Sequence, residues 1–494
     1  HFDELTVMAD SSTKKTVGTS FPSQNNSQVN DGTVNLENMP LCGGQIWVLI
    51  VASMGQFIGQ GLATLVGIII PMIELMAHPE LPAIVQGVLG CVALCGRTLG
   101  TVLFGRMSDR WGYLTVARVC PLLMIVASLI AYFWHPVWLL CICLFVMGLS
   151  VGGEYSIDSD YISEIMPKKW KFFMVGAAKA SASVGSVVVA ALCYFIIRGW
   201  TIAASWPNLL FIMTGIAGVI LLMRIHFAES PGWLMSHGRT RDAEKAVHYL
   251  LGKDVYMPVP PQQSATEGQP SDSMWTFMRK NVRKILFTGV PWACEGLGVY
   301  GIGIFIPILI MSLGIDYVSP TAPRMAHIVN SVEITILLSV FMTVGFGMGL
   351  AVVRRYYHVS MQTYGFIGSA VGLGVMLAAY QLHWPAWISI TGFVLFELFL
   401  NAGPHLITFI LPSQVYPVIN RGSGVGLSAA IGKFGAVLGA FFIPVMLKHW
   451  GCGAVIAVSV VVMLLGALVT GILGPKVLPE SHIDDDVTDV ARHS

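Results

Sequence analysis

Residues 453–474 read GAVIAVSVVVMLLGALVTGILG and contain no charged side chain. A bilayer core about 30 Å thick is crossed by about 20 helical residues, so this stretch is long and apolar enough to span a membrane. Stretches of the same kind recur along the whole chain. Twelve are predicted, in two groups of six, at 45–74, 83–105, 114–134, 137–160, 172–197 and 205–226, then at 285–312, 326–353, 360–382, 386–411, 422–447 and 453–474.

The composition agrees with an all-α polytopic membrane protein. Of the 494 residues 55% are apolar and 11% are charged, whereas soluble domains carry about 25% charged residues. A net charge of +1 leaves no basic surplus for binding nucleic acid. The nine cysteines lack the paired spacing of a zinc site, so we expect no metal and no disulfide framework. Without a phosphate-binding loop or a nucleophile motif, we expect neither an enzyme nor a cofactor.

The segments between the spans predict the orientation and the domain limits. If the N-terminus is cytoplasmic, most loop lysines and arginines also lie on the cytoplasmic side. We therefore expect both termini in the cytoplasm, in a plasma or bacterial inner membrane, and no signal peptide. The predicted regions are a disordered tail over 1–44 (1–7, ahead of Met8, interpreted as a cloning remnant), bundles over 45–226 and 285–474, a linker with short helices over 227–284, and a tail over 475–494.

An internal repeat relates the two groups of spans. Ser163, Pro167, Lys171, Gly176 and Gly185 recur 250 residues later as Ser413, Pro417, Arg421, Gly426 and Gly435. Parallel repeats related by an axis along the membrane normal occur in transporters whose binding site lies between the halves, near the midplane. The repeat therefore predicts two pseudo-symmetric six-helix bundles around a central site.

Motifs at the predicted cytoplasmic ends resemble those of the major facilitator superfamily. Residues 105–112, GRMSDRWG, are similar to its signature, although Tyr113 stands where a base usually follows. Ser163-Glu164 with Pro167 and Lys171, and residues 229–234, ESPGWL, resemble the sugar-porter branch and its organic-ion relatives. We expect charged residues of these segments to form latches that hold the cytoplasmic side closed in one state. The predicted latch residues are Asp109, Arg110, Arg106, Glu164, Lys171, Glu229 and Arg421.

The C-terminal half resembles the phosphate:proton symporters. NAGP at 401–404, TFILP at 408–412 and GKFGA at 432–436 follow that family's order and spacing. Trp292 and Tyr300 also fit, and Gly153-Glu154-Tyr155 is similar to its Gly-Asp-Tyr. The resemblance implies an anionic substrate and proton coupling.

Three departures from that family leave phosphate itself open. Its acidic residue in the first span is missing, and Gln56 and Gln60 are the polar groups there. Its acid four residues after the Trp is Gly296 here, with Glu295 one place earlier, and its Gln in the fifth span is not found.

Polar side chains deep in the spans are the candidate site residues. A charge at the bilayer centre costs about 2.5–3.5 kcal/mol on insertion scales, so each should face the bundle interior and have a partner. At about 1.5 Å per residue, Gln56, Glu295, Glu397 and Lys433 lie near the midplane. The predicted substrate-binding residues are Lys433, Glu295, Trp292, Tyr300, Asn401, Glu397, Gln56, Gln60, Tyr155, Lys179 and Arg97.

Several of these candidates have a second interpretation. Lys433 either binds the anion or forms a structural ion pair with Glu397 or Glu295. Lys179 either joins the site or extends its amine to the cytoplasmic interface. Arg97 either binds an anion or neutralises Glu154.

The predicted proton-coupling residues are Glu154, Glu295 and Asp158, because a carboxyl in a low-dielectric site can load and release protons. Glu154 is preferred, since it lies between the midplane and the predicted inner mouth. Asp158 alternatively belongs to the cytoplasmic gate. Histidines and cysteines elsewhere in the spans are interpreted as packing.

Together these features predict a monomeric secondary transporter that imports a small anion with protons by alternating access, inorganic phosphate or an organic anion. The alternatives are a neutral sugar or polyol symporter, then a drug exporter, or a non-transporting nutrient receptor on the same fold.

Overall fold

The computed structural model describes residues 34–35, 40–77, 81–167, 170–199, 203–225, 227–252, 255–256, 274–314, 319, 321–416 and 421–478. Most of the predicted N-terminal tail, the residues from 479 onward and the middle of the predicted linker lie outside these ranges. Pro417 lies outside them too, and the side chains of Lys171 and Arg421 are not described.

The N-terminal bundle consists of six long helices that follow the predicted spans. They are α1 (Gly43–Met76), α2 (Ala83–Trp111), α3 (Tyr113–Phe133), α4 (Val137–Ile165), α5 (Lys171–Gly199) and α6 (Leu210–Ile225), with the 3-10 helix η2 (Ala203–Leu209) before α6. The connecting region contains α7 (Pro231–Ser236), α8 (Thr240–Leu251), the strand β2 (Val255–Tyr256) and α9 (Met274–Lys280). The strand β1 (Val34–Asn35), in the predicted disordered tail, pairs with β2 in parallel, so this part of the tail is ordered, contrary to the prediction.

The C-terminal bundle contains more interrupted helices. Its elements are α10 (Val282–Gly296), the π-helix η3 (Leu297–Ile302), α11 (Ile306–Ser312), α12 (Arg324–Val352), α13 (His358–Gln381), α14 (Ala386–Ala402), α15 (Pro404–Val415) and α16 (Arg421–Val477). The break between α14 and α15 lies at Gly403, where Pro404 supplies no N–H for a continuous helix.

Eleven helical segments in the described ranges are long and apolar enough to cross a membrane. The last, Gly424–Val477, is 54 residues long, and the left-handed backbone at Gly451 (φ 78°) divides it into two. Counting both parts restores the predicted number of twelve. The all-α, two-bundle architecture is therefore confirmed, and α1 begins two residues before the predicted first span.

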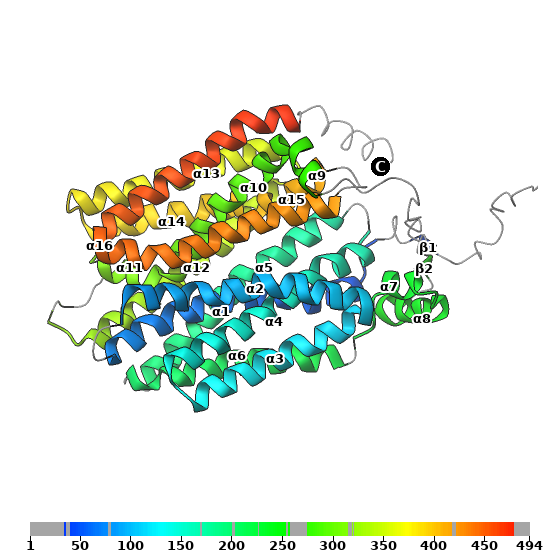
Figure 1. The fold of residues 1–494 in the computed structure, drawn as a ribbon, viewed down its shortest axis with the longest axis horizontal. Coiled ribbons are helices and arrows are strands. Elements are labelled where there is room, and N and C mark those ends of the chain that lie inside the picture. The colour runs from blue at the N-terminus through cyan, green and yellow to red at the C-terminus, as the bar shows by residue number, and fades with distance from the viewer. Residues whose placement is uncertain are drawn as a thin grey trace, which may run out of the picture.

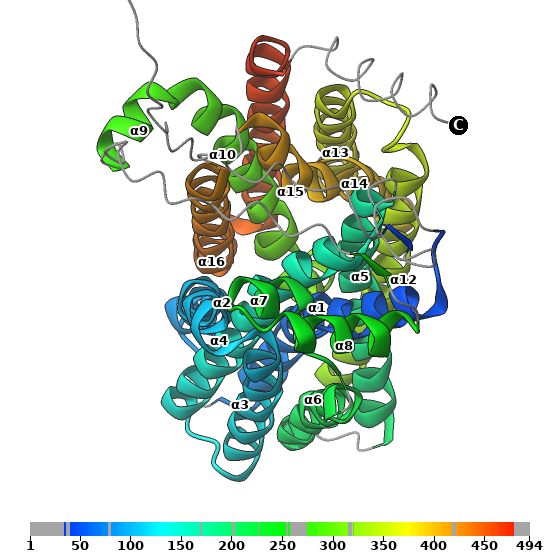
Figure 2. The same ribbon diagram turned by 90° about the vertical axis from the view of Figure 1, so that its right-hand side faces the viewer.

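The two bundles lie side by side, with α1–α6 in one and α10–α16 in the other (Figure 1). The connecting helices α7 and α8 lie at one end, which we call the linker end; α1 begins there, with Gly44 against Leu250 of α8. Viewed from that end, α7 and α8 lie in front of the N-terminal bundle and α9 lies beside α10 (Figure 2). We call the opposite end the far end.

Glycines allow the closest helix contacts and thereby fix the height of two cations. A Cβ on Gly152 of α4 would overlap the backbone carbonyl of Arg97 on α2, and one on Gly435 of α16 would overlap that of Ala293 on α10. Small residues at such contacts let backbones approach closely. Arg97 and Lys433 are thus carried by tightly packed helix pairs.

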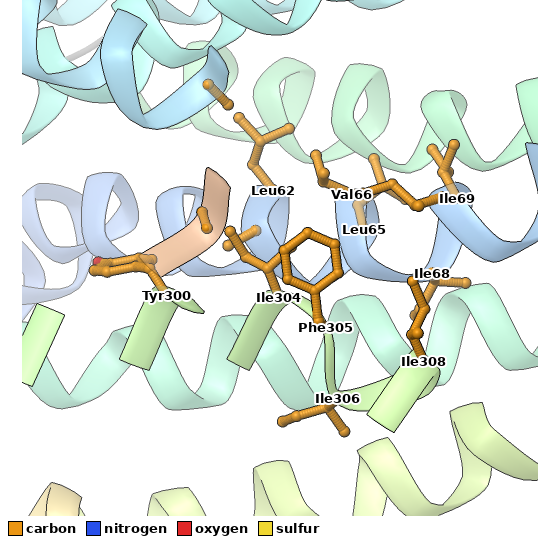
Figure 3. Packing of buried hydrophobic residues seen from close by; sticks show 14 of the residues in the cluster. Leu62, Leu65, Val66, Ile68, Ile69, Tyr300, Ile304, Phe305, Ile306 and Ile308 are labelled. Carbon is orange, nitrogen blue, oxygen red and sulfur yellow. The ribbon is translucent and has the colours of Figure 1, made fainter. Parts of the chain in front are cut away.

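Apolar packing joins the two bundles toward the far end. Leu65 and Ile68, in the second half of α1, belong to one buried cluster with Ile304, Phe305 and Ile308 of the C-terminal bundle (Figure 3). Toward the linker end the apolar residues form smaller clusters. One surrounds Phe287 and Tyr416 in the C-terminal bundle, with Ala180 of α5 packed against it, and others surround Val48 and Phe104 in the N-terminal bundle. The described conformation is therefore closed at the far end.

Candidate functional site

A polar cavity of about 40 Å³ lies between the two bundles. Both halves of the chain line it, which agrees with the midplane site that the repeat predicts. Its lining residues are Leu94, Arg97, Thr98, Tyr155, Lys179, Trp292, Glu295, Gly296, Tyr300, His405, Thr408, Phe409, Gly432, Lys433 and Ala436. We call it the central cavity.

Three cationic side chains from three helices face the central cavity. Arg97 (α2) and Lys179 (α5) are buried, and Lys433 (α16) is partly buried. Within the described part of the chain, no carboxylate lies within ion-pair distance of any of the three. The alternative that Lys433 forms a structural ion pair with Glu295 or Glu397 is therefore not realised in this conformation.

Aromatic side chains hold two of these cations. The Arg97 Nη1 donates a hydrogen bond of 2.7 Å to the Tyr300 hydroxyl across the bundle interface. The Arg97 guanidinium lies 4.9 Å, and the Lys433 amine 4.4 Å, from the ring centroid of Tyr155. An aromatic face attracts a cation at such distances. The Arg97 Nε, by contrast, has no hydrogen-bond partner among the described residues.

One carboxylate, Glu295, shares the central cavity with the cations. Its Oε1 lies 3.5 Å from the Nε2 of His405. The other ring nitrogen of His405, Nδ1, is 2.7 Å from the Oδ1 of Asn401. Asn401 in turn donates from Nδ2 to the Oε2 of Glu397 at 3.0 Å. A buried polar chain therefore runs from Glu397 to the central cavity.

Several predicted binding residues line a second cavity of about 20 Å³, beside the central one. It contains Gln60, Glu397 and Asn401, together with residues that sequence analysis did not select. These are Thr64, Ser186, Val299, Gly303, Ile306, Thr335, Ser339 and Met342. Gln60, Glu397 and Asn401 are thus separated from Lys433, contrary to the single site expected. Gln56 is buried but lines neither of these cavities.

The second cavity also spans the interface between the bundles. Ser186 of α5 hydrogen-bonds Thr64 of α1 at 2.8 Å and Ser339 of α12 at 2.9 Å. The Oε1 of Gln60 is buried there without a described partner. These hydroxyl and amide groups can exchange hydrogen bonds with polar, uncharged atoms.

Glu154 lies outside both cavities, in a buried ion pair. The Nη1 of Arg224 in α6 donates a hydrogen bond of 2.7 Å to the Oε1 of Glu154, and the Nη2 lies 2.6 Å from the Oε2 in an ion-pair contact. Asp158 lies 4.0 Å from the same guanidinium, and its oxygens have no described hydrogen-bond partner. The partner of Glu154 is therefore Arg224 and not Arg97, which corrects one interpretation of Arg97.

A family profile decides what kind of protein carries these sites. The family described as Sugar (and other) transporter matches residues 19–484. The chain belongs to this family. It is a multi-pass membrane transporter of the major facilitator superfamily and not an enzyme.

Three relatives illustrate the breadth of the family. The inner membrane metabolite transport protein YgcS of Escherichia coli (strain K12) is 26% identical over 420 residues, covering 83% of this chain and 87% of YgcS. Inorganic phosphate transporter 1-2 of Oryza sativa subsp. japonica is 25% identical over 394 residues, covering 73% and 74%. The inward-open structure of the xylose transporter XylE from E. coli has the same fold, with a TM-score of 0.69 and 16% identity, covering 88% of this chain and 96% of XylE. A second structure describes XylE as a proton:xylose symporter.

The predicted latch residues of this transporter bind mainly to the connecting segment of their own bundle. The Glu229 carboxylate accepts hydrogen bonds from the backbone N–H of Leu114, at the start of α3, and of Ser230. The Ser230 hydroxyl donates to Glu164, and the Trp233 indole donates to the backbone carbonyl of Asp109.

These bonds fasten α7 to the α2–α3 turn and do not join the two bundles, which differs from the latch as predicted. Arg106 and Arg110 are exposed, and Lys171 and Arg421 lie outside the described side chains. A contact that does cross the interface at the linker end is Arg354, whose guanidinium lies 5.6 Å from the ring centroid of Trp170.

Two buried residues of the transporter were missed from the sequence. His405 was interpreted as packing, although it follows Asn401 by four residues, as Asn401 follows Glu397. That spacing was a usable signal, because residues four apart share a helix face. Arg224 lies near the end of the sixth span, where a basic residue is normally taken as a flank.

Proposed function

We propose that this transporter carries a small anion together with protons, and that the anion binds in the central cavity between Arg97, Lys179 and Lys433. The observation that supports this most is the charge balance of the cavity lining. Three cations and one carboxylate face the same space, and no described carboxylate lies within ion-pair distance of the cations.

The cost of burying these charges supports an anionic ligand. Each cation near the membrane centre costs about 2.5–3.5 kcal/mol on insertion scales unless it gains a partner. Tyr155 and Tyr300 offset part of that cost through ring and hydroxyl contacts. The remaining positive charge favours a ligand with at least one negative charge, bound by charge-assisted hydrogen bonds.

Two anion classes fit this lining, inorganic phosphate and a small organic anion. Phosphate is supported by the similarity to plant phosphate transporters. An organic anion is supported by Trp292 and Phe409, which give the cavity apolar walls.

Proton coupling is assigned to Glu295 in preference to Glu154. A proton carrier has to change its charge during the cycle, and a change of charge at Glu154 would break its buried ion pair with Arg224. Glu295 faces the same cavity as the proposed anion. The anion and the proton would then be bound within one site and carried across together.

Alternating access would require the far-end apolar cluster to separate. Leu65, Ile68, Ile304 and Phe305 close that side in the present conformation. The lysines and arginines of the sequence favour a cytoplasmic linker end, with both termini on that side. Because one chain supplies the whole lining of the central cavity, the proposed transport unit is the monomer.

A neutral sugar remains the second candidate. The hydroxyl and amide groups of the second cavity, including the unpartnered Oε1 of Gln60, suit sugar hydroxyls. The fold shared with a xylose transporter agrees with this candidate.

A thermal-shift panel on purified protein separates the two candidates. A ligand that binds only the native state raises its apparent stability. We expect phosphate or carboxylates to raise the melting temperature and neutral sugars to leave it unchanged.

Replacing Lys433 tests whether the central cavity binds the anion. Losing one charge-assisted bond removes about 1.5–3 kcal/mol, so Lys433→Gln should weaken anion binding about ten- to hundredfold. Lys448→Gln, at an exposed lysine of the same helix, is the control and should bind normally. Stabilisation by sugars alone, or an unchanged anion shift in Lys433→Gln, would refute the proposal.

A further inference from the structure

Three residues of the buried polar chain lie on one line across a helix break. Glu397, Asn401 and His405 are spaced by four, with the break at Gly403 between the last two. The Asn401 Nδ2 donates to the backbone carbonyl of Glu397 at 2.7 Å and to its carboxylate at 3.0 Å. Both acceptors require an N–H from Asn401, so its amide orientation is fixed.

The fixed amide determines which nitrogen of His405 carries hydrogen. With its Nδ2 engaged by Glu397, Asn401 presents only its Oδ1 to the Nδ1 of His405, at 2.7 Å. A carbonyl oxygen accepts only, so Nδ1 must be the donor. In a neutral imidazole, Nε2 is then a bare acceptor.

Nε2 of His405 faces another acceptor. Oε1 of Glu295 lies 3.5 Å away, and Nε2 has no hydrogen-bond partner among the described residues. His405 is 1% exposed and Glu295 is 3% exposed, so bulk water has little access to the opposed lone pairs. Two buried acceptors in contact are costly unless a proton lies between them.

We infer that Glu295 and His405 together form a proton-binding site that holds one proton between Oε1 and Nε2. The loaded pair, a carboxylic acid on a neutral imidazole or a carboxylate with an imidazolium, has no net charge. Release of the proton to water in the central cavity leaves the pair with one negative charge. This inference rests on the proposed function, because it names the group that carries the coupled proton.

The surroundings of the pair explain how the proton and the anion bind together. Arg97 from α2, Lys179 from α5 and Lys433 from α16 line the same cavity and favour the negatively charged, unloaded pair. Tyr155 from α4 and Tyr300 from η3 line it as well.

On its other sides His405 meets the ring of Phe346 from α12, with centroids 4.9 Å apart, and the amide of Asn401 from α14, behind which lies Glu397. An anion bound to the three cations neutralises them and thus favours the loaded pair. By linkage, each of the two ligands then raises the affinity for the other.

Asn401 acts here as a positioning residue. It touches neither the proton nor the central cavity, but it determines the tautomer and so leaves Nε2 free to face Glu295. Replacing it with Leu removes the acceptor, and both tautomers of His405 then become available.

Nitrogen NMR of the full-length protein labelled with [15N]histidine tests the site without any substrate. The chain has thirteen histidines, so the signals of His405 are identified as those absent in His405→Gln. The wild type should show a protonated Nδ1 throughout, and an Nε2 signal that shifts in one step as pH is raised. Glu295→Gln should abolish that step and keep Nδ1 protonated, whereas Asn401→Leu should spread the proton over both nitrogens.

The controls are His358 and Glu333. His358 bonds to Gln414 through Nδ1, outside the central cavity, so its signals should be the same in Glu295→Gln. Glu333→Gln, at an exposed carboxylate of α12, should keep the His405 step. Gel filtration confirms that each variant is folded before its spectrum is interpreted.

Three results would overturn the inference: an Nε2 signal that does not change over the pH range in which the protein is folded, a step that persists in Glu295→Gln, or a bare Nδ1 in the wild type. Failure of the proposed function looks different. In that case the NMR step is present, but no phosphate or carboxylate stabilises the protein.

Discussion

Breaking the buried pair between Arg224 and Glu154 should lower stability without uncoupling transport. Arg224→Met would remove a guanidinium that makes one hydrogen bond and one ion-pair contact with the Glu154 carboxylate and also hydrogen-bonds the backbone carbonyl of Ala117 at 2.9 Å. Both Glu154 and Arg224 are 2% exposed, so water cannot replace the lost partner. Glu154 and Asp158 would then be two buried carboxylates without a cation.

The geometry ranks three substitutions at this cluster. Removing one member of a buried ion pair costs about 3–5 kcal/mol, which we expect for Arg224→Met. Glu154→Gln keeps an oxygen acceptor for Arg224, and Asp158 remains 4.0 Å away as a counter-charge. Its cost should therefore approach that of one hydrogen bond to a charged group, about 1.5–3 kcal/mol. Asp158→Asn should cost least, because the Asp158 oxygens have no described hydrogen bond to lose.

Unfolding of the three variants in detergent, followed by tryptophan fluorescence, measures this order. Arg279→Met, at an exposed arginine of α9, is the matched control and should change stability by less than about 0.5 kcal/mol. If Arg224→Met were as stable as the control, the pair would not be structural. If Glu154→Gln instead kept full stability and lost proton-driven accumulation, the proton would bind Glu154, and our assignment to Glu295 would be wrong.

Two further predictions concern the linker end and the far end. Gly112 has a φ of 93° and lies against the carboxylate of Glu229. Gly112→Ala should therefore lower the free energy of unfolding by at least about 1–2 kcal/mol in the same assay. An unchanged unfolding midpoint would contradict this prediction. Phe305→Ala should loosen the far-end cluster and speed maleimide labelling of Cys91, while Cys120 in a linker-end cluster reacts as before. If Cys91 were labelled at the same rate in Phe305→Ala as in the wild type, Phe305 would not close that end.

The sequence predicted the architecture because it depends on long-range patterns that survive in one dimension. Twelve apolar stretches and a repeat of constant offset specify two bundles. The height of a residue in its span follows from the helix rise. Lys433 and Glu295 were selected on this basis, and the structure brings them to one cavity together with the predicted Lys179 and Arg97.

The lateral position of a side chain was not predictable in the same way. Gln60, Glu397 and Asn401 line a second cavity, because the direction of a side chain depends on how the helices rotate against each other. In span seven Val299 faces this second cavity, whereas the adjacent Tyr300 of the same π-helix faces the central one.

The ion-pair partners of buried charged residues could not be predicted from the sequence either. Glu154 was correctly placed deep in the fourth span, but its partner Arg224 comes from the sixth, 70 residues later in the chain. Nothing in one sequence joins two such residues without knowledge of which helices are neighbours. The proton was therefore first assigned to a carboxylate that a guanidinium already binds.

The most direct test of the account is uptake of a labelled anion, the one that best stabilises the purified protein, into vesicles with an imposed pH gradient. The wild type should concentrate the anion above its external level only while the gradient lasts, and Lys433→Gln should concentrate it far less at an external level below its weakened affinity. Accumulation of a neutral sugar in place of the anion, or accumulation by Lys433→Gln equal to that of the wild type, would contradict the central claim.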